Sequence, residues 1–124
     1  MNCIEVEGLN KYFPTAHRGQ LMHAVNNVSF CVKENEFLGL VGESGCGKST
    51  IAKMLIGLIN SNSGSLKIHG ETVKYPYHRS VYKDIQMIFQ MPKDSFDPKK
   101  TMGQALKRVL KNFGLTDHFQ ERME

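Results

Sequence analysis

The sequence predicts an α/β fold with an antiparallel β portion and a helical C-terminal part. Three observations predict it: alternating apolar residues near the N-terminus, a continuous apolar run just before residue 42, and apolar residues at helical spacing later. The 124 residues are 40% hydrophobic and carry a net charge of +4. These values are typical of a globular domain and exclude a disordered or low-complexity chain.

The first third predicts strands separated by a loop and a turn. Residues 3–9 and 28–32 alternate apolar with polar or small side chains, which is typical of half-buried strands. Residues 11–20 contain proline and glycine and predict a loop, and residues 34–36 predict a tight turn. The run over residues 37–41 is short, apolar and nearly continuous, which predicts a strand buried on both faces of a parallel sheet.

The middle of the chain predicts a buried helix followed by a hairpin. Apolar residues over 50–59 favour a largely buried helix, which the polar segment SNSGS then ends. Residues 65–73 alternate around a turn at Gly70 and predict a hairpin. A loop with three tyrosines, interpreted as surface packing, leads into a further strand predicted over residues 84–90.

The last part predicts helices. Thr101 with Gln104 forms the pattern of a capping box, and Gly114 stands where a C-terminal cap belongs. A second helix is expected to begin within residues 115–124. The apolar face of the first of these helices is expected to comprise Ala105, Leu106, Val109, Leu110 and Phe113.

Residues 42–49, GESGCGKS, fit G-x-x-x-x-G-K-[ST], the phosphate-binding loop. Glycines let the backbone wrap around phosphates, and its N–H groups converge on the anion together with the N-terminus of the next helix. Lys48 would place a positive charge near the β- and γ-phosphates, and Ser49 would offer a hydroxyl to Mg²⁺. Cys46 is interpreted as a tolerated small residue. The expected phosphate-binding residues are Gly42, Glu43, Ser44, Gly45, Cys46, Gly47, Lys48, Ser49 and Thr50.

These residues resemble the ATP-binding subunits of ABC transporters, in the oligopeptide, dipeptide and nickel import branch. The loop GESGCGKST is typical of that branch, and 40 residues after Thr50 comes Gln90 in MIFQMPKDSFDP. This segment resembles the family's Q-loop, MIFQ-x-P-x-x-S-x-N-P, with Asp97 at the asparagine position. The flanking sequences VNNVSFCVKENEFLGLVG and SGSLKIHG also look like that family, so the resemblance covers nearly the whole chain.

The resemblance implies ATP and Mg²⁺ as cofactors. Phe13 would stack on adenine, with Tyr12 as the alternative and core packing as the other interpretation of either ring. Ser49 would bind Mg²⁺, and Gln90 would reach both Mg²⁺ and the attacking water. Lys48 and Gln90 would thus assist a catalytic site that is incomplete in this chain.

The resemblance also implies an organisation and partners. Residues 1–124 would be the N-terminal part of an ABC ATP-binding domain, with the core over 1–90 and the start of a helical subdomain over 91–124. The expected partners are membrane-spanning permease subunits and a second ATP-binding subunit. The expected location is the cytoplasmic face of the cell membrane.

The family's signature sequence of LSGGQ type, its acidic strand and its switch histidine have no counterpart among these residues. We therefore expect ATP binding that powers solute import in the complete family domain, and little hydrolysis by this chain alone. A non-catalytic nucleotide-binding fragment or regulatory module is the alternative. A P-loop kinase or GTPase is a third hypothesis.

Composition argues against several other classes. The longest apolar stretch, Met54–Ile59, is far shorter than the roughly 20 residues of a membrane span, and the N-terminus lacks a signal-peptide pattern. Cys3 and Cys31 are expected to be small buried residues rather than parts of a disulfide framework. No nucleic-acid partner is expected, because no aromatic residues alternate with the basic cluster near the C-terminus, which comprises Lys99, Lys100, Lys107, Arg108 and Lys111.

Overall fold

The computed structural model describes residues 1–115, with the side chain of Asp94 left out. It contains two compact units, Met1–Met87 and a second unit that starts at Ile88, and each is described by itself. The first unit holds the sheet, the helix α1 and the phosphate-loop motif. The predicted division after residue 90 stays a prediction.

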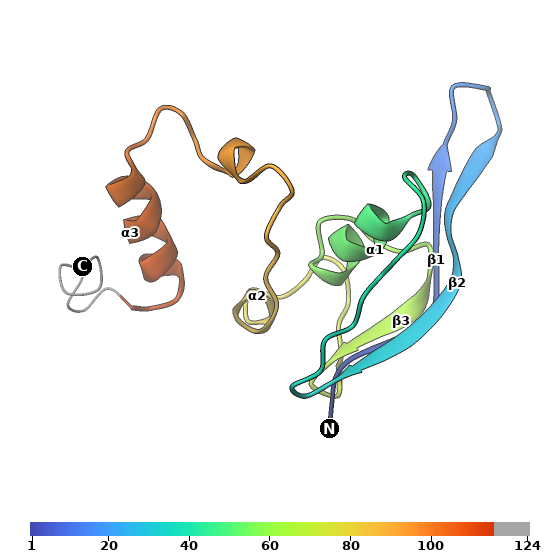
Figure 1. Cartoon of the computed structure of the whole chain (residues 1–124), viewed down its shortest axis with the longest axis horizontal. Helices are drawn as coiled ribbons and strands as arrows, with labels where there is room; N and C mark the ends of the chain where they lie inside the picture. The colour runs from blue at the N-terminus through green and yellow to red at the C-terminus, as the bar shows by residue number, and fades with distance from the viewer. Residues whose placement is uncertain (116–124) are drawn as a thin grey trace. The chain divides into compact units, whose positions relative to one another are not determined.

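The first unit is built on a four-stranded antiparallel sheet in the order β2-β1-β3-β4. The strands are β1 (Asn2–Pro14), β2 (Leu21–Lys33), β3 (Ser63–Ile68) and β4 (Glu71–Thr72). Figure 1 shows β1 and β2 as a long twisted ribbon, with β3 along the lower half of β1. The predicted antiparallel portion and the hairpin around Gly70 are confirmed.

The β1–β2 ribbon is longer than the sequence pattern predicts. Residues 11–14, expected in a loop, continue β1, with Tyr12 paired to His23. The register shifts at several points along β1, which indicates bulges, and Gly8 has a φ of +57° within one of them. Gly64 of β3 passes close to this point: a Cβ there would lie 2.5 Å from the Gly8 carbonyl oxygen, so only glycine fits.

Helix α1 (Lys48–Leu55) packs its apolar side on the sheet. It ends earlier than predicted, because Gly57 adopts a φ of +70° and turns the chain away. The Met54 carbonyl oxygen near the end of the helix accepts two hydrogen bonds, from the Gly57 N–H at 3.0 Å and from the Tyr77 hydroxyl at 2.7 Å. The buried core consists of Val6, Leu9, Val25, Ile51, Met54, Leu66 and Ile68.

The strand predicted over residues 37–41 is absent, and this prediction is wrong. The segment has no regular secondary structure, Phe37 is fully exposed and Val41 is 94% exposed. A strand buried on both faces needs neighbours on both sides, and no strand within residues 1–115 pairs with it. The strand predicted over residues 84–90 is absent too, since α2 (Val81–Asp84) includes its first residue and the rest is irregular.

The second unit contains a 3₁₀ helix, Pro92–Ser95, and α3 (Met102–Asn112). The predicted capping box is confirmed: the Gln104 N–H donates to Thr101 Oγ1 at 3.3 Å, and the Thr101 N–H donates to Gln104 Oε1 at 3.1 Å. Gly114 follows the helix with a φ of +70°, as its role of C-terminal cap requires. The second helix predicted within residues 115–124 falls almost entirely on residues 116–124, outside the described ones.

Among the helices of residues 1–115, none combines the length and the apolar composition that crossing a bilayer requires.

Candidate functional site

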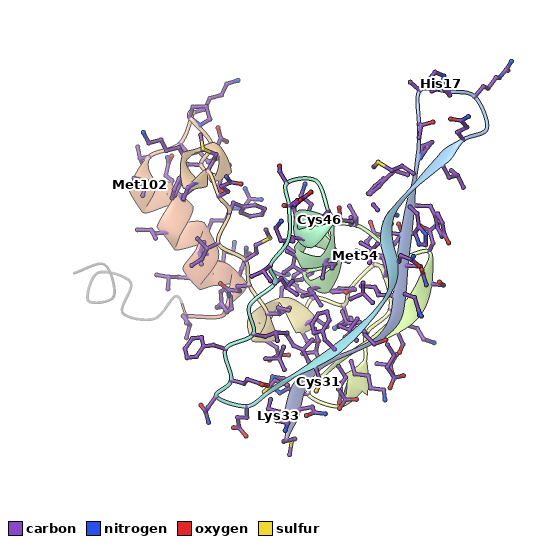
Figure 2. All side chains as sticks on the ribbon, turned by 45° about the vertical axis from the view of Figure 1, so that its right-hand side comes forward. His17, Cys31, Lys33, Cys46, Met54 and Met102 are labelled. Atoms are coloured by element: carbon purple, nitrogen blue, oxygen red, sulfur yellow. The ribbon has the colours of Figure 1, made fainter. Side chains whose placement is uncertain are left out.

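The phosphate-loop motif lies in the first unit, between residues 36–41, which have no regular secondary structure, and the start of α1. Its turn is closed by a hydrogen bond from the Cys46 N–H to the Glu43 carbonyl oxygen, at 3.3 Å. Gly45 and Gly47 have φ values of +80° and +100°, which side chains other than glycine rarely adopt. Figure 2 shows Cys46 on this loop directly above α1. The loop therefore has the backbone bends that wrapping around an anion requires.

Gly47 anchors the loop to the sheet. A Cβ at this position would lie 2.3 Å from the carbonyl oxygen of Ala24 in β2, so the loop backbone passes directly against that strand. The Gly47 carbonyl oxygen then accepts the first helical hydrogen bond, from the Ile51 N–H at 2.9 Å. The start of α1 is thus held in place by β2 through a contact that only glycine permits.

The first turn of α1 provides the donors that an anion needs. The leading N–H groups of an α-helix have no partner within the helix, and the helix dipole makes this end positive. Here that turn begins at Lys48 and includes Ser49 and Thr50. The Ser49 side chain is exposed and its hydroxyl oxygen is a suitable ligand for a hard cation such as Mg²⁺. The donor set therefore fits a phosphate group with its metal ion.

Lys48 is the only cation within the motif, and its ammonium group lies back over the loop. Nζ donates to the carbonyl oxygens of Gly42 and Glu43, with 2.7 Å to the latter. It also lies 3.5 Å from Cys46 Sγ. The loop therefore closes around its own cation, which brings the positive charge against the same backbone segment that the motif predicts to surround a phosphate.

Phe13 and Tyr12 lie on opposite faces of β1, because successive side chains of a strand alternate. Lys11 shares the face of Phe13: its Nζ lies 5.3 Å from the Phe13 ring centroid and donates to Asn60 Oδ1, just after α1, at 3.1 Å. Phe13 is therefore on the α1 side of the sheet. Tyr12 instead stacks on His23, with centroids 4.1 Å apart and an 18° angle between rings.

Gln90, the remaining predicted site residue, is exposed and belongs to the second unit. Because the phosphate loop belongs to the first unit, the expected contact of Gln90 with Mg²⁺ stays a prediction. The structure places residues 42–47 in a loop that leads directly into residues 48–50 in the first turn of α1, and it places Phe13 on the face of the sheet that carries α1.

Tyr77 has a role that the sequence interpretation missed. Its ring lies against Gly57, where an added Cβ would come within 2.6 Å of the ring. Burial, with a smaller contribution from Tyr82, raises the pKa of Tyr77 to about 12. The interpretation of Tyr77 as surface packing is wrong, because its hydroxyl donates to a carbonyl oxygen at the end of α1. The only indication of this role in the sequence was the position of Tyr77 after a helix that ends in glycine. The expectation of a buried Cys31 is also wrong, because that side chain is exposed, whereas Cys3 is half-buried.

The comparisons with known proteins agree on one family. The family model described as ABC transporter matches residues 25–124. The nickel import ATP-binding protein NikE of Shigella flexneri is 34% identical over 120 residues, covering 90% of this chain and 44% of that protein. The oligopeptide transport ATP-binding protein AppF of Bacillus subtilis is 38% identical over 115 residues, covering 84% and 34%. OppF of Escherichia coli, also named for oligopeptide transport, is 41% identical over 95 residues, covering 74% and 28%.

Solved structures share the fold. The dimeric structure of a bacterial ABC transporter cassette matches with a TM-score of 0.69 and 23% identity, over 91% of this chain and 47% of that one. A post-hydrolysis state of an ATP-binding cassette, bound to ADP and Pi, matches with a TM-score of 0.51 and 26% identity, over 56% and 29%. The chain thus spans less than half the length of these relatives. Because the family model covers most of it, the chain belongs to the ABC transporter family, in the ATP-binding branch whose members are named for peptide and nickel import.

Proposed function

We propose that the chain binds Mg-ATP through residues 42–50 and acts as the ATP-binding part of an importer for peptides, nickel or a related solute. One observation carries this proposal: a glycine loop anchored on β2 leads directly into α1 and places the Lys48 ammonium against its own backbone. The names of the relatives, which combine ATP binding with peptide or nickel import, support it.

Each site residue has a proposed role. Lys48 and the N–H groups of the first turn of α1 hold the triphosphate, while Ser49 and Gln90 hold Mg²⁺. Mg²⁺ neutralises charge that develops on the phosphate oxygens. Phe13 supports the adenine ring, and its position on the α1 side of β1 favours it over Tyr12.

In the complete family domain the function extends to hydrolysis and transport. We infer that this needs permease subunits and a second ATP-binding subunit, at the cytoplasmic face of the membrane. The second candidate is a nucleotide-binding module without turnover, which is compatible with a phosphate loop whose observed contacts, Gly47 with Ala24 and Lys48 with Glu43, lie within the first unit. Binding and turnover measurements separate the two.

The binding test is a calorimetric titration of the chain with Mg-ATP. Lys48→Ala removes a cation whose charge-assisted hydrogen bonds to phosphate are each worth about 1.5–3 kcal/mol, so affinity should fall roughly 10- to 100-fold. Lys53→Ala, an exposed lysine on the same helix, is the matched control and should leave affinity unchanged. Equal affinities for the two variants would contradict the proposed site.

The turnover test uses the same proteins and measures phosphate release. We expect a rate at background level for the chain alone. A rate clearly above background that disappears in Lys48→Ala would overturn the expectation of binding without turnover.

A second binding experiment tests the adenine contact. Phe13→Ala should weaken ATP affinity more than Tyr12→Ala, because only Phe13 lies on the α1 face. If Tyr12→Ala weakened affinity more, the proposed roles of the two rings would be exchanged.

A further inference from the structure

A cavity of about 420 Å³ lies at the end of α1 opposite the phosphate loop. Its walls come from β1, β3, the last residues of α1 and the segment that follows β4, all within the first unit. Met54, labelled in Figure 2, lies in this wall on α1. No residue of the phosphate-loop motif lines it, so this cavity is separate from the proposed nucleotide site.

The floor of the cavity is apolar and its rim is polar. Leu9, Met54 and Leu66 form part of the floor, and each of them is buried. The size lies within the roughly 300–1,000 Å³ of small-molecule sites, which combine apolar walls with a few polar groups. The polar residues of the lining, apart from its two tyrosines, are Asn60, Ser61, Ser65, Thr72 and Lys74.

Lys74 is the only charged residue in the lining. In the described part of the chain it has no ion-pair or hydrogen-bond partner, unlike Lys67, which pairs with Glu5 at 3.6 Å. A lone cation beside an apolar floor attracts an anion with an apolar body. The single charge suits a single carboxylate rather than a triphosphate, which requires several converging donors.

Tyr77 and Gly57 stabilise one wall of the cavity. The Tyr77 hydroxyl donates to the Met54 carbonyl oxygen at 2.7 Å, and its ring packs against Gly57. Tyr75 forms another part of the wall and is half-exposed, so it lies at the entrance. Because a hydrogen bond and close ring packing already hold this wall, less conformational entropy should be lost when a ligand binds.

We propose that this cavity binds a small amphipathic carboxylate, whose apolar body contacts Leu9, Met54 and Leu66 and whose carboxylate pairs with Lys74. The site does not depend on the proposed nucleotide site, since the two share no residue. Occupancy of one should therefore leave the affinity of the other unchanged.

The test is a titration of the full, isotope-labelled chain with octanoate, followed by amide chemical shifts, with octan-1-ol as the neutral probe of the same length. Octanoate should bind more tightly than octan-1-ol and shift resonances of Leu66, Val73 and Tyr77. Mg-ATP should not displace it.

Variants separate specific pairing from general adsorption on apolar surface. Lys74→Met should weaken octanoate about fivefold and leave octan-1-ol unchanged, while Lys74→Arg should retain most of the affinity. Lys83→Met is the matched control, because Lys83 is an exposed lysine of α2 that lines no part of this cavity. Equal binding of the two probes, equal loss in Lys74→Met and Lys83→Met, or shifts confined to the phosphate loop would each overturn the proposal.

Discussion

Replacing Gly47 with alanine should damage stability and nucleotide binding more than the same change at Gly45. Both glycines have a left-handed φ, +100° and +80°, so both substitutions strain the backbone. Only at Gly47 does the added Cβ meet backbone, at 2.3 Å from the Ala24 carbonyl oxygen; at Gly45 it meets nothing within 4 Å. The pair therefore isolates the contact between the loop and β2.

The expected magnitudes follow from these geometries. A left-handed conformation costs a residue with a Cβ about 1–2 kcal/mol, which is the whole effect expected for Gly45→Ala. At Gly47 the overlap can be relieved only by moving the loop or β2, because the opposing atom is backbone. Strained local arrangements cost about 1–3 kcal/mol, so Gly47→Ala should lose about 2–5 kcal/mol in total.

The assay is urea unfolding followed by circular dichroism, together with the Mg-ATP titration of each folded variant. Gly42→Ala provides an internal contrast, because its Cβ would lie 2.5 Å from Cys46 Sγ, an exposed side chain. Cys46→Ala in the same protein should therefore restore most of the loss from Gly42→Ala, whereas no side-chain change at Ala24 should rescue Gly47→Ala. Equal losses for Gly45→Ala and Gly47→Ala would refute the reasoning.

Two further predictions concern Tyr77 and the capping box. The raised pKa of Tyr77 means that the unfolded chain loses this proton at lower pH than the folded one, so its stabilisation is complete below pH 10 and lost as pH rises through about 12. Allowing for its half-exposed position, the stability advantage over Tyr77→Phe should shrink by about 1 kcal/mol across that range. An absorbance titration that finds all tyrosines ionising near pH 10 would contradict it. Thr101→Ala should destabilise α3 by about 1 kcal/mol, and adding Gln104→Ala should cost less than the sum of the single changes, measured by hydrogen exchange of the α3 amides; full additivity would argue against a reciprocal cap.

Features determined by neighbouring residues could be predicted from the sequence. The glycine bends of the phosphate loop, the hairpin around Gly70 and the capping box of Thr101 with Gln104 each depend on residues only a few positions apart. Their chemistry is specific, since left-handed turns need glycine and a helix start needs a side-chain acceptor. The structure confirms the hairpin and the cap and gives the loop the backbone geometry that its glycines predict.

Features that depend on distant partners could not be predicted in the same way. The apolar run over residues 37–41 has the composition of a buried strand, but composition does not supply the neighbouring strands that would bury it. The apolar pattern over residues 50–59 likewise did not predict where the helix ends. That end depends on the left-handed Gly57 and on the hydrogen bond from Tyr77, which lies 20 residues after Gly57 in the chain. The extension of β1 through residues 11–14 depends on pairing with β2.

The contacts that shape the phosphate loop bear on whether this chain can bind nucleotide without hydrolysing it. The contacts that shape the loop are all internal to the first unit: Gly47 against Ala24, and Lys48 against Gly42 and Glu43. Gln90, which the proposed mechanism needs beside the metal, belongs to the second unit. Since the observed loop contacts lie within the first unit and the proposed turnover also uses Gln90 of the second, we expect phosphate affinity to survive changes that abolish hydrolysis.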